Sequence, residues 1–327
     1  MLATFVRYFS FMNSQPVAPV SFGAPIVGDA PVKLVATDVD GTILSYAQSM
    51  TGEVSARTVE AFQAAREAGI AVVLVTGRPV RGLRGVSSAL GLIGPVIASN
   101  GAMTYDLAAD APLDHQPLAA QALFTAKDLI QELDPTVAFA AETPRMLHME
   151  ESFARGSLWF DDERRRAVGI RDEEIAMGPL DDTLERHSAW PVAAEGLTPQ
   201  VPVLKLLAKT HEMEADAFIA AAQERVGHMV TVTHSAPGIS LLEISAKGVN
   251  KAQALRRYAD SLGIDAENTI AFGDMPNDIE MLQWAGTSWA VGSAHPMARS
   301  AADRVAGTCE DDGVAEVLEL LLKGTLT

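Results

Sequence analysis

The chain has 327 residues, 48% of them hydrophobic and 20% charged, so it is long enough for two domains and can bury a sizeable core. Its formal net charge of −17 argues against nucleic acid or an anionic membrane as a partner, because both would repel an acidic protein. The single cysteine, Cys309, excludes an internal disulfide framework and suits the reducing cytoplasm. No apolar run approaches the roughly 20 residues that a membrane-spanning helix needs.

Residues 1–30 are expected to be a disordered extension. The first 12 residues are apolar and aromatic with Arg7 as the only charge, and a stretch rich in Pro, Gly and Ser follows. A signal peptide is an alternative, although the charged region before the apolar run is weak and no clean small-residue cleavage site stands out.

An apolar run that ends in two carboxylates organises the rest of the chain. Residues 34–36 predict a short buried strand, and Asp38 and Asp40 follow it directly before Gly41. Residues two apart in an extended chain point to the same side, so both carboxylates are expected to converge at the carboxyl end of the strand. Two close carboxylates repel, and a divalent cation between them removes that cost. A hairpin turn is the alternative, but the residues after Leu44 are polar and then helical.

The elements on either side of a long middle region predict a parallel sheet. A helix over residues 55–68 and a strand over 70–75 follow the first strand, which makes a βαβ unit. Residues 95–98 predict a third strand. The same texture returns with a helix over 251–262 and a strand over 269–272. Further helices are expected at 83–90, 279–285 and 314–322, and a further strand at 288–291.

The middle region has a different texture and predicts a separate α+β domain. Residues 106–117 are loop-like, residues 160–191 are charge-rich and irregular, and the three arginines at 164–166 are interpreted as a solvated surface. Helices are expected at 119–133 and 212–226, and strands at 136–141, 146–149, 203–208, 229–234 and 241–244.

Polar motifs follow four of the strands predicted for the parallel sheet. They are Asp38 with Asp40, Thr76-Gly77-Arg78, Asn100-Gly101, and Asp274 with Asn277 and Asp278. Parallel strands deliver their carboxyl ends to one edge of the sheet, so these groups are expected to meet there.

With these motifs the sequence resembles the haloacid dehalogenase superfamily of phosphotransferases, and within it the Cof-type branch. The four family motifs appear as Asp38-Val39-Asp40-Gly41-Thr42, Thr76-Gly77-Arg78, Lys251 at the end of the run Lys247-Gly248-Val249-Asn250, and Gly273-Asp274-Met275-Pro276-Asn277-Asp278. The resemblance covers about residues 32–325. It departs at Met275, where the branch usually has a small or polar residue, and at Ala252, where a glycine is common.

The resemblance implies an α/β fold, with a Rossmann-like parallel-sheet core domain and an inserted α+β cap domain. One loop and one helix suffice between Asp38 and Thr76, whereas well over a hundred residues separate Thr76 from Lys251, so the insertion lies between the second and third motifs. The expected boundaries are 31–103 and 239–327 for the core and 104–238 for the cap.

The resemblance also implies roles for the motif residues. Asp38 would be the nucleophile, and Asp40 would protonate the leaving group and then activate water. The phosphoryl group would be held by Val39, Thr76, Gly77, Lys251 and Asn277. Mg²⁺ would bind Asp38, the Asp40 backbone carbonyl and Asp274, with Asp278 supporting these ligands.

The predicted function is therefore a magnesium-dependent phosphatase of small phosphorylated metabolites, with sugar phosphates the favoured class, acting in the cytoplasm through an aspartyl-phosphate. A phosphomutase of the same superfamily is one alternative. A catalytically silent protein that binds phosphorylated metabolites is another, although it would not need both Asp38 and Asp40. The sequence does not predict an oligomeric state.

Structural roles stay open for some of these residues. Thr76 could cap a helix, Asn277 and Asp278 could cap the helix expected after them, and Arg78 could form a structural ion pair. Between the two lysines of the third motif, Lys251 is the favoured phosphate ligand, because the family lysine opens this helix.

Overall fold

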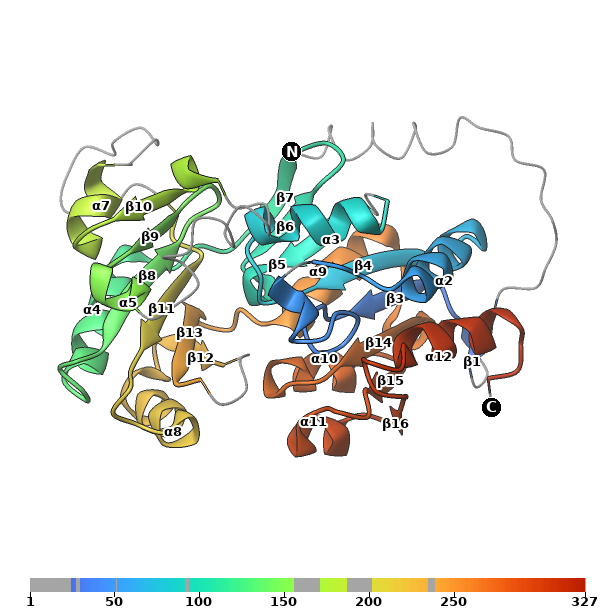
Figure 1. The fold of residues 1–327 in the computed structure, drawn as a ribbon. Coiled ribbons are helices and arrows are strands. Elements are labelled where there is room, and N and C mark those ends of the chain that lie inside the picture. Colours follow the sequence, from blue (N-terminus) through green and yellow to red (C-terminus); the bar gives the residue numbers. More distant parts are fainter. Residues whose placement is uncertain are drawn as a thin grey trace.

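The computed structural model describes residues 25–27, 30–50, 52–91, 94–155, 171–186, 202–234 and 239–326. They form two lobes, each built around one large sheet (Figure 1). The α-helices are α2 (Ala56–Glu67), α3 (Arg84–Ala89), α4 (Ala120–Gln131), α5 (Glu151–Ala154), α7 (Leu180–Arg186), α8 (Ala215–Val226), α9 (Lys251–Leu262), α10 (Ile279–Trp284), α11 (Pro296–Ala301) and α12 (Gly313–Leu322).

The strands of the first lobe are β3 (Leu34–Thr37), β4 (Ala71–Val75), β5 (Pro95–Ala98), β6 (Met103–Asp106), β7 (Ala111–His115), β14 (Thr269–Gly273), β15 (Thr287–Ala290) and β16 (Arg304–Val305). They form one sheet in the order β16-β15-β14-β3-β4-β5-β6-β7. Strands β16 to β5 are parallel, and β6 and β7 run antiparallel to their neighbours. The predicted parallel-sheet core is confirmed.

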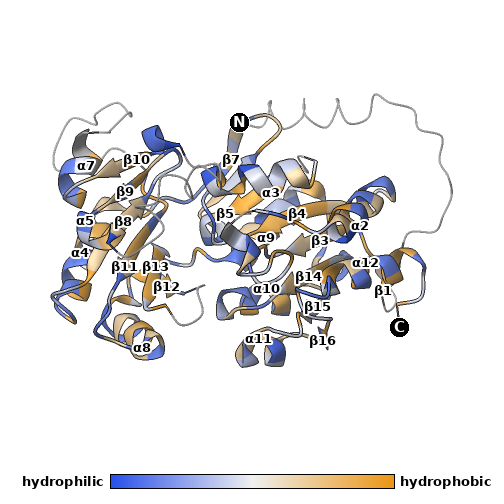
Figure 2. Cartoon of the chain, viewed as in Figure 1, coloured by the Kyte–Doolittle hydropathy of each residue, from blue (hydrophilic) through white to orange (hydrophobic). Residues whose placement is uncertain are grey.

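Strand β3 lies in the middle of this sheet, and all four of its residues are buried. A parallel strand covered on both faces is expected to be continuously apolar, which is what the run Leu34 to Ala36 shows. Helix α2 packs against α12, and α9 packs against α10. In Figure 2 the central strands β3 and β4 are coloured largely as apolar, while several of the covering helices carry polar colours. The first lobe therefore has one continuous core.

The second lobe is the inserted cap. Its strands are β8 (Ala138–Glu142), β9 (Leu147–Met149), β10 (Ile175–Met177), β11 (Lys205–Lys209), β12 (Val230–Thr233) and β13 (Leu241–Ala246), in the sheet order β10-β9-β8-β11-β13-β12. Only the pairing of β10 with β9 is parallel. Helices α4 and α8 pack together, and Phe139, Leu206, Phe218 and Ile244 lie in a second apolar core.

Both predicted cap boundaries differ from the sheets that the chain forms. Strands β6 and β7 belong to the core sheet, so the cap begins after residue 115, near the bridge between Leu118 and Val203. Strand β13 belongs to the cap sheet, where it lies between β11 and β12, so the cap ends near residue 246. Residues 106–117 were expected to be loop, but β7 is a half-exposed edge strand that contains Pro112, and it lacks the apolar pattern of a buried strand.

Two other regions are more regular than the sequence pattern indicates. Within 160–191 the described residues form a 3₁₀ turn (Asp172–Glu174), β10 and α7, whereas the arginines at 164–166 lie outside the described residues. Residues 1–24 also lie outside them, but β1 (Ile26–Val27) pairs with β2 (Ala30–Pro31), so ordered structure begins before the expected boundary at residue 31. Helix α11 and strand β16 were not predicted. No helix in the described part of the chain has the length and apolar character needed to cross a membrane.

The turn after β5 presses against the start of α9. Gly101 has φ +94°, and a Cβ atom there would lie 2.3 Å from the Asn250 carbonyl oxygen. We predict that Gly101→Ala lowers the free energy of unfolding by about 2–4 kcal/mol, through backbone strain and this clash. Urea denaturation measures the change. The control is Gly85→Ala in α3, where nothing lies within 4 Å of an added Cβ and little or no loss is expected; equal losses at both positions would contradict the prediction.

Candidate active site

Strand register places the first, second and fourth motifs at one edge of the core sheet. Thr37, the last residue of β3, pairs with Phe272 of β14 on one side and with Leu74 of β4 on the other. The residues that follow these strands therefore emerge side by side, as predicted. The Asp38 amide extends this alignment by donating a 3.0 Å hydrogen bond to the Phe272 carbonyl.

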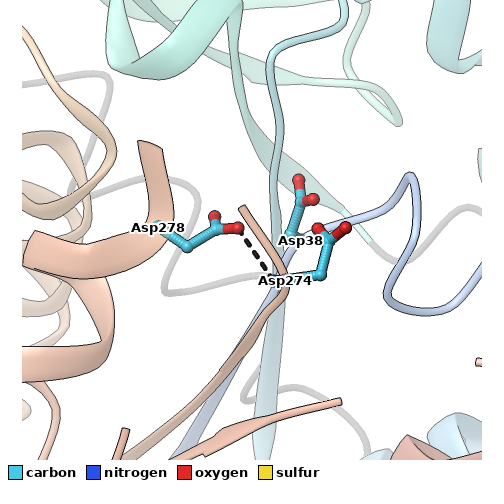
Figure 3. A group of neighbouring side chains, drawn as sticks. All are labelled: Asp38, Asp274 and Asp278. Atoms are coloured by element: carbon cyan, nitrogen blue, oxygen red, sulfur yellow. Dashed lines mark hydrogen bonds between the residues drawn. The ribbon is translucent and has the colours of Figure 1, made fainter. Parts of the chain in front are cut away.

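Three buried carboxylates, those of Asp38, Asp274 and Asp278, gather at this edge (Figure 3). One oxygen of each lies within 4.8 Å of one oxygen of each of the others. They come from the end of β3, the end of β14 and the 3₁₀ turn η7 (Pro276–Asp278). Carboxylate oxygens in this number are suitable ligands for a hard divalent cation.

The ammonium group of Lys251 bridges two of these carboxylates. Its Nζ atom lies 2.7 Å from Asp38 Oδ1 and 2.7 Å from Asp278 Oδ1, and the residue is only 1% exposed. Lys251 is the first residue of α9, where the Asn250 side chain caps the helix by accepting from the Gln253 amide at 2.8 Å. Lys247 lies elsewhere, with its exposed ammonium on the Gly227 carbonyl. The structure thus places Lys251, and not Lys247, in the cluster.

Asp278 also fixes the loop that carries Asp274. Its second oxygen, Oδ2, accepts hydrogen bonds from the backbone amides of Asp274 and Met275, both at 3.0 Å. The carboxylate therefore caps the turn η7, and not α10, for which its side chain makes no capping bond. One residue organises both the lysine and the neighbouring carboxylate.

Asp274 has two hydroxyl partners from the segment after the first motif. Tyr46 donates to Oδ2 at 2.7 Å, and Thr42 donates to Oδ1 at 3.3 Å. Gly41 makes this approach possible, because it has φ +79° and a Cβ atom there would lie 2.2 Å from Asp274 Oδ2 and 2.7 Å from the Tyr46 ring. Tyr46 was not predicted as a site residue, since a tyrosine in a polar loop belongs to no motif.

Asp40 stands apart from the carboxylate cluster. Arg78 grips it with two hydrogen bonds, from Nε to Oδ2 at 2.6 Å and from Nη2 to Oδ1 at 2.5 Å, and Ser49 donates to Oδ1 as well. The expected convergence of both carboxylates on one cation is therefore not seen for the Asp40 side chain, because β3 ends at Thr37 and strand alternation does not continue past it. Arg78 thus forms the ion pair that was expected as an alternative, and its partner is Asp40, the predicted acid–base residue.

The remaining phosphate-binding candidates lie beside this edge. The hydroxyl oxygen of Thr76 accepts from the Arg78 amide at 3.0 Å and caps no helix, since the next helical turn begins at Val80. The Gly77 carbonyl accepts from Lys205 of the cap at 2.7 Å. The Val39 carbonyl closes the turn of the first motif by accepting from the amides of Ile43 and Leu44.

Asn277 is tied to the cap through one intermediate residue. Its Nδ2 donates to Asn100 Oδ1 at 3.1 Å, and Asn100 Nδ2 donates to Glu243 Oε2 of strand β13 at 2.7 Å. Asn277 Oδ1 is buried without a hydrogen-bond partner among the described residues. Lys205 and Glu243 were not singled out from the sequence, although Glu243 is the single charge of the apolar strand β13, and that pattern was a usable signal.

Comparison with known proteins agrees with this arrangement. Residues 35–318 match the family of haloacid dehalogenase-like hydrolases. The chain belongs to this family.

Relatives of this hydrolase are phosphatases by name. The phosphatase YitU of Bacillus subtilis, named for 5-amino-6-(5-phospho-D-ribitylamino)uracil, is 25% identical over 296 residues, which cover 88% of this chain and 96% of YitU. Pyridoxal phosphate phosphatase YbhA of Escherichia coli is 27% identical over 291 residues, which cover 88% of this chain and 97% of YbhA. The predicted Cof-type branch and the predicted class, a phosphoric monoester hydrolase, are confirmed.

Solved structures share the fold. SMU.1108c from Streptococcus mutans superposes with a TM-score of 0.71 at 21% identity, covering 89% of this chain and 99% of the other. The sugar phosphatase BT4131, of haloacid dehalogenase subclass IIB, superposes with a TM-score of 0.70 at 19% identity, covering 88% and 98%.

The charges of the cluster shift the pKa values of its members. Burial raises the pKa of Asp38 well above its usual value, and the nearby Asp278 and Asp274 carboxylates add to this against the opposing pull of Lys251. Burial, with repulsion from Asp278, raises the pKa of Asp274 to about 7. Burial lowers the pKa of Lys251, but attraction to Asp278 and Asp38 outweighs it and raises the value overall. Three carboxylates facing one ammonium leave an excess of negative charge, which fits a divalent cation.

The raised pKa of Asp274 makes the stability of the metal-free hydrolase depend on pH. Between its ordinary pKa of 3.8 and about 7, the folded protein holds a proton that the unfolded chain has lost. The contribution of Asp274 to stability therefore falls as pH rises through this window, by at most about 1.4 kcal/mol per pH unit. We predict that Asp274→Asn flattens this slope and makes the protein more stable at pH 8, as measured by urea denaturation in EDTA.

The control for this measurement is Asp260→Asn, because Asp260 is exposed and lies on α9 away from the cluster. Its slope should follow that of the wild type. Identical slopes for wild type and Asp274→Asn would show that this carboxylate does not hold the extra proton.

Proposed function

We propose that this hydrolase is a magnesium-dependent phosphatase of small phosphorylated metabolites, sugar phosphates in particular, and that it works through an aspartyl-phosphate on Asp38. The observation that carries the proposal is the bridge from Lys251 Nζ to Asp38 and Asp278 inside a buried carboxylate cluster. The named substrates of its relatives are also small phosphorylated metabolites.

The donor set fits Mg²⁺. Asp38, Asp274 and the Asp40 carbonyl would hold it with Asp278 behind them, and when bound it would neutralise charge on the phosphoryl oxygens and on the attacking carboxylate. Tyr46 and Thr42 orient the Asp274 carboxylate. Asp278 orients the backbone on which Asp274 stands. The shape of the site thus follows from hydrogen bonds within the chain.

Lys251 can hold the nucleophile and the phosphoryl group at once. An ammonium has three N–H donors, and Asp38 and Asp278 accept two of them. The third can donate to a phosphoryl oxygen, together with Thr76, the Gly77 amide and Asn277. A carboxylate oxygen of Asp38 then attacks phosphorus, and the bond from phosphorus to the leaving-group oxygen breaks.

Asp40 supplies the proton chemistry of both half-reactions. Protonated, it donates to the departing alkoxide, and as a carboxylate it then takes a proton from the water that attacks the aspartyl-phosphate. That second attack releases inorganic phosphate and restores Asp38. The two-point grip of Arg78 and the bond from Ser49 hold Asp40 in one orientation for both steps.

The first test of this function is hydrolysis of p-nitrophenyl phosphate with Mg²⁺ and with EDTA. We predict release of inorganic phosphate only with the metal. A panel of phosphorylated metabolites then identifies the substrate class. A sugar phosphate that is isomerised without phosphate release would favour a phosphomutase, and binding without turnover of any compound would favour a silent binding protein.

Substitutions of the two carboxylates of the first motif are expected to impair catalysis in different ways. Asp38→Asn should abolish turnover and phosphoenzyme formation while the fold persists, because the substitution relieves repulsion in the cluster. Asp40→Asn should slow turnover by about 10²–10⁴-fold, most strongly for alkyl phosphates, whose leaving groups need a proton. Steady-state rates on aryl and alkyl phosphates measure this. Equal rates for Asp40→Asn and wild type on an alkyl phosphate would remove Asp40 from the acid role.

The third motif offers a matched pair of lysines. We predict that Lys251→Ala lowers kcat/KM by at least about 10²-fold, since it removes a charge facing the transferred group, whereas Lys247→Ala stays near wild type. Lys251→Arg should rescue only in part, because a guanidinium is larger and planar. Circular dichroism checks that each variant is folded. A larger loss at Lys247 would assign the phosphate to that residue.

A further inference from the structure

A group of buried charges joins the cap to the core beside the phosphate-binding turn. Arg81 of the core lies 3.5 Å from Glu142 of the cap, Lys205 pairs with both Glu142 and Glu243, and none of the four residues is more than 6% exposed. Lys205 Nζ lies 2.7 Å from Glu243 Oε1 and 3.5 Å from Glu142 Oε2. Burial lowers the pKa of Lys205, but attraction to Glu142 and Glu243 outweighs this and raises the pKa above its usual value, so the ammonium stays charged. Two positive and two negative charges balance in this cluster.

Asn100 extends from the core into this cluster. Ser99 and Asn100 have φ of 50° and 55°, a left-handed conformation that asparagine tolerates better than most residues. The turn aims the Asn100 amide between the cap and the active site. Its Nδ2 donates to Glu243 Oε2 at 2.7 Å, and its Oδ1 accepts from Asn277 Nδ2 at 3.1 Å.

The carboxylate at one end of this chain sets the direction of both amides. A carboxylate can only accept, so Glu243 requires the Asn100 NH₂ group to face it. The Asn100 oxygen then faces Asn277 and requires the NH₂ group of that residue in turn. Each NH₂ group has two hydrogens, so Asn277 keeps one for another acceptor. An anionic phosphoryl oxygen needs such a donor, and an inverted Asn277 amide would turn a carbonyl oxygen toward it.

We propose that Glu243 of the cap orients the amide of Asn277 through Asn100, so that Asn277 presents its NH₂ group to the phosphoryl group. Glu243 and Asn100 are positioning residues, because they act through Asn277 and do not themselves touch the phosphate. The inference rests on the proposed function in one respect, that Asn277 binds a phosphoryl oxygen. Under this proposal, the contact between the cap and the core helps to set the geometry of the phosphate site.

The hydrogen bond from Lys205 to Glu243 makes it possible to predict the effect of a single isosteric substitution. In Glu243→Gln, Lys205 can only donate, so the new amide must direct its oxygen to Lys205 and its NH₂ group to Asn100. Asn100 then reverses, and Asn277 reverses after it. The substitution is isosteric, yet it inverts the order of donors as far as the phosphate.

The readout is the Kd of inorganic phosphate for the magnesium-saturated enzyme, measured by titration calorimetry, with the KM for p-nitrophenyl phosphate beside it. Glu243→Gln should raise both at least about 10-fold, and Asn100→Asp alone should do the same by setting two carboxylates against each other. The double substitution of Glu243→Gln with Asn100→Asp should return the Kd to within about threefold of wild type. A carboxylate at position 100 accepts from both neighbours and restores the donor order at Asn277.

Two further variants test whether the effect runs through Asn100 and whether it reflects only a loosened contact between cap and core. Asn100→Gly keeps the left-handed turn while removing the amide, and its loss of affinity should not grow when Glu243→Gln is added. Arg84→Met breaks the cap–core ion pair with Glu174, which lies outside the hydrogen-bond chain from Glu243 through Asn100 to Asn277, and should leave the Kd within twofold. Thermal unfolding checks every variant.

The outcomes separate this proposal from the proposed function. Wild-type phosphate affinity in Glu243→Gln, or a double variant no better than the singles, overturns the orientation of Asn277 even if the enzyme is an active phosphatase. An Arg84→Met loss as large as that of Glu243→Gln reduces the effect to general loosening of the cap and also overturns it. A wild type that binds phosphate with the expected variant pattern but never turns over would refute the phosphatase and leave this inference standing.

Discussion

The arrangement of the candidate active site depends on the two hydrogen bonds that the Lys251 ammonium donates to buried carboxylates. Buried carboxylates at the ends of β3 and β14 repel one another, and bringing them together costs free energy unless a cation lies between them. Lys251 Nζ lies 2.7 Å from both Asp38 and Asp278. A lysine at the first position of a helix is unfavourable by up to about 1 kcal/mol, because that end already carries partial positive charge. Two charge-assisted hydrogen bonds outweigh this, and the residual negative charge leaves room for a divalent ion.

The cap–core contact follows a different electrostatic rule from the site beneath it. There the charges balance, with Arg81 and Lys205 against Glu142 and Glu243. A balanced polar contact costs little when it opens, since water replaces each partner, whereas an apolar one would hold the lobes shut. A cap that must admit substrate and release product needs contacts of this kind. In the cluster of Asp38, Asp274, Asp278 and Lys251 three carboxylates face one ammonium, and a divalent cation would offset the excess negative charge.

The sequence predicts most of the core because its signals are local. Residues 34–36 are apolar in a central parallel strand, Asn250 caps α9, and each motif stands directly after its strand. What it misses depends on distant partners: the expected boundary at residue 239 assigns β13 to the core although it pairs with β11 of the cap, and Tyr46 meets Asp274 only through the folded loop. The cluster of Asp38 with Asp274 and Asp278 was predicted from the motifs as a metal site, whereas the position of the Asp40 side chain depends on its contacts with Arg78 and Ser49, which no local pattern predicts.

Asp38 and Asp40 show how two identical side chains can take different roles within three residues of chain. Asp38 faces other carboxylates and an ammonium in a buried site, where a metal and a phosphoryl group can meet it. Asp40 faces outward from that cluster onto Arg78 and Ser49, where a leaving group or a water can meet it. Directly after Asp40, Gly41 lets Asp274 and the Tyr46 ring approach the backbone, because it lacks a Cβ atom. In the proposed mechanism this difference in environment, and not residue type, separates the nucleophile from the acid–base residue.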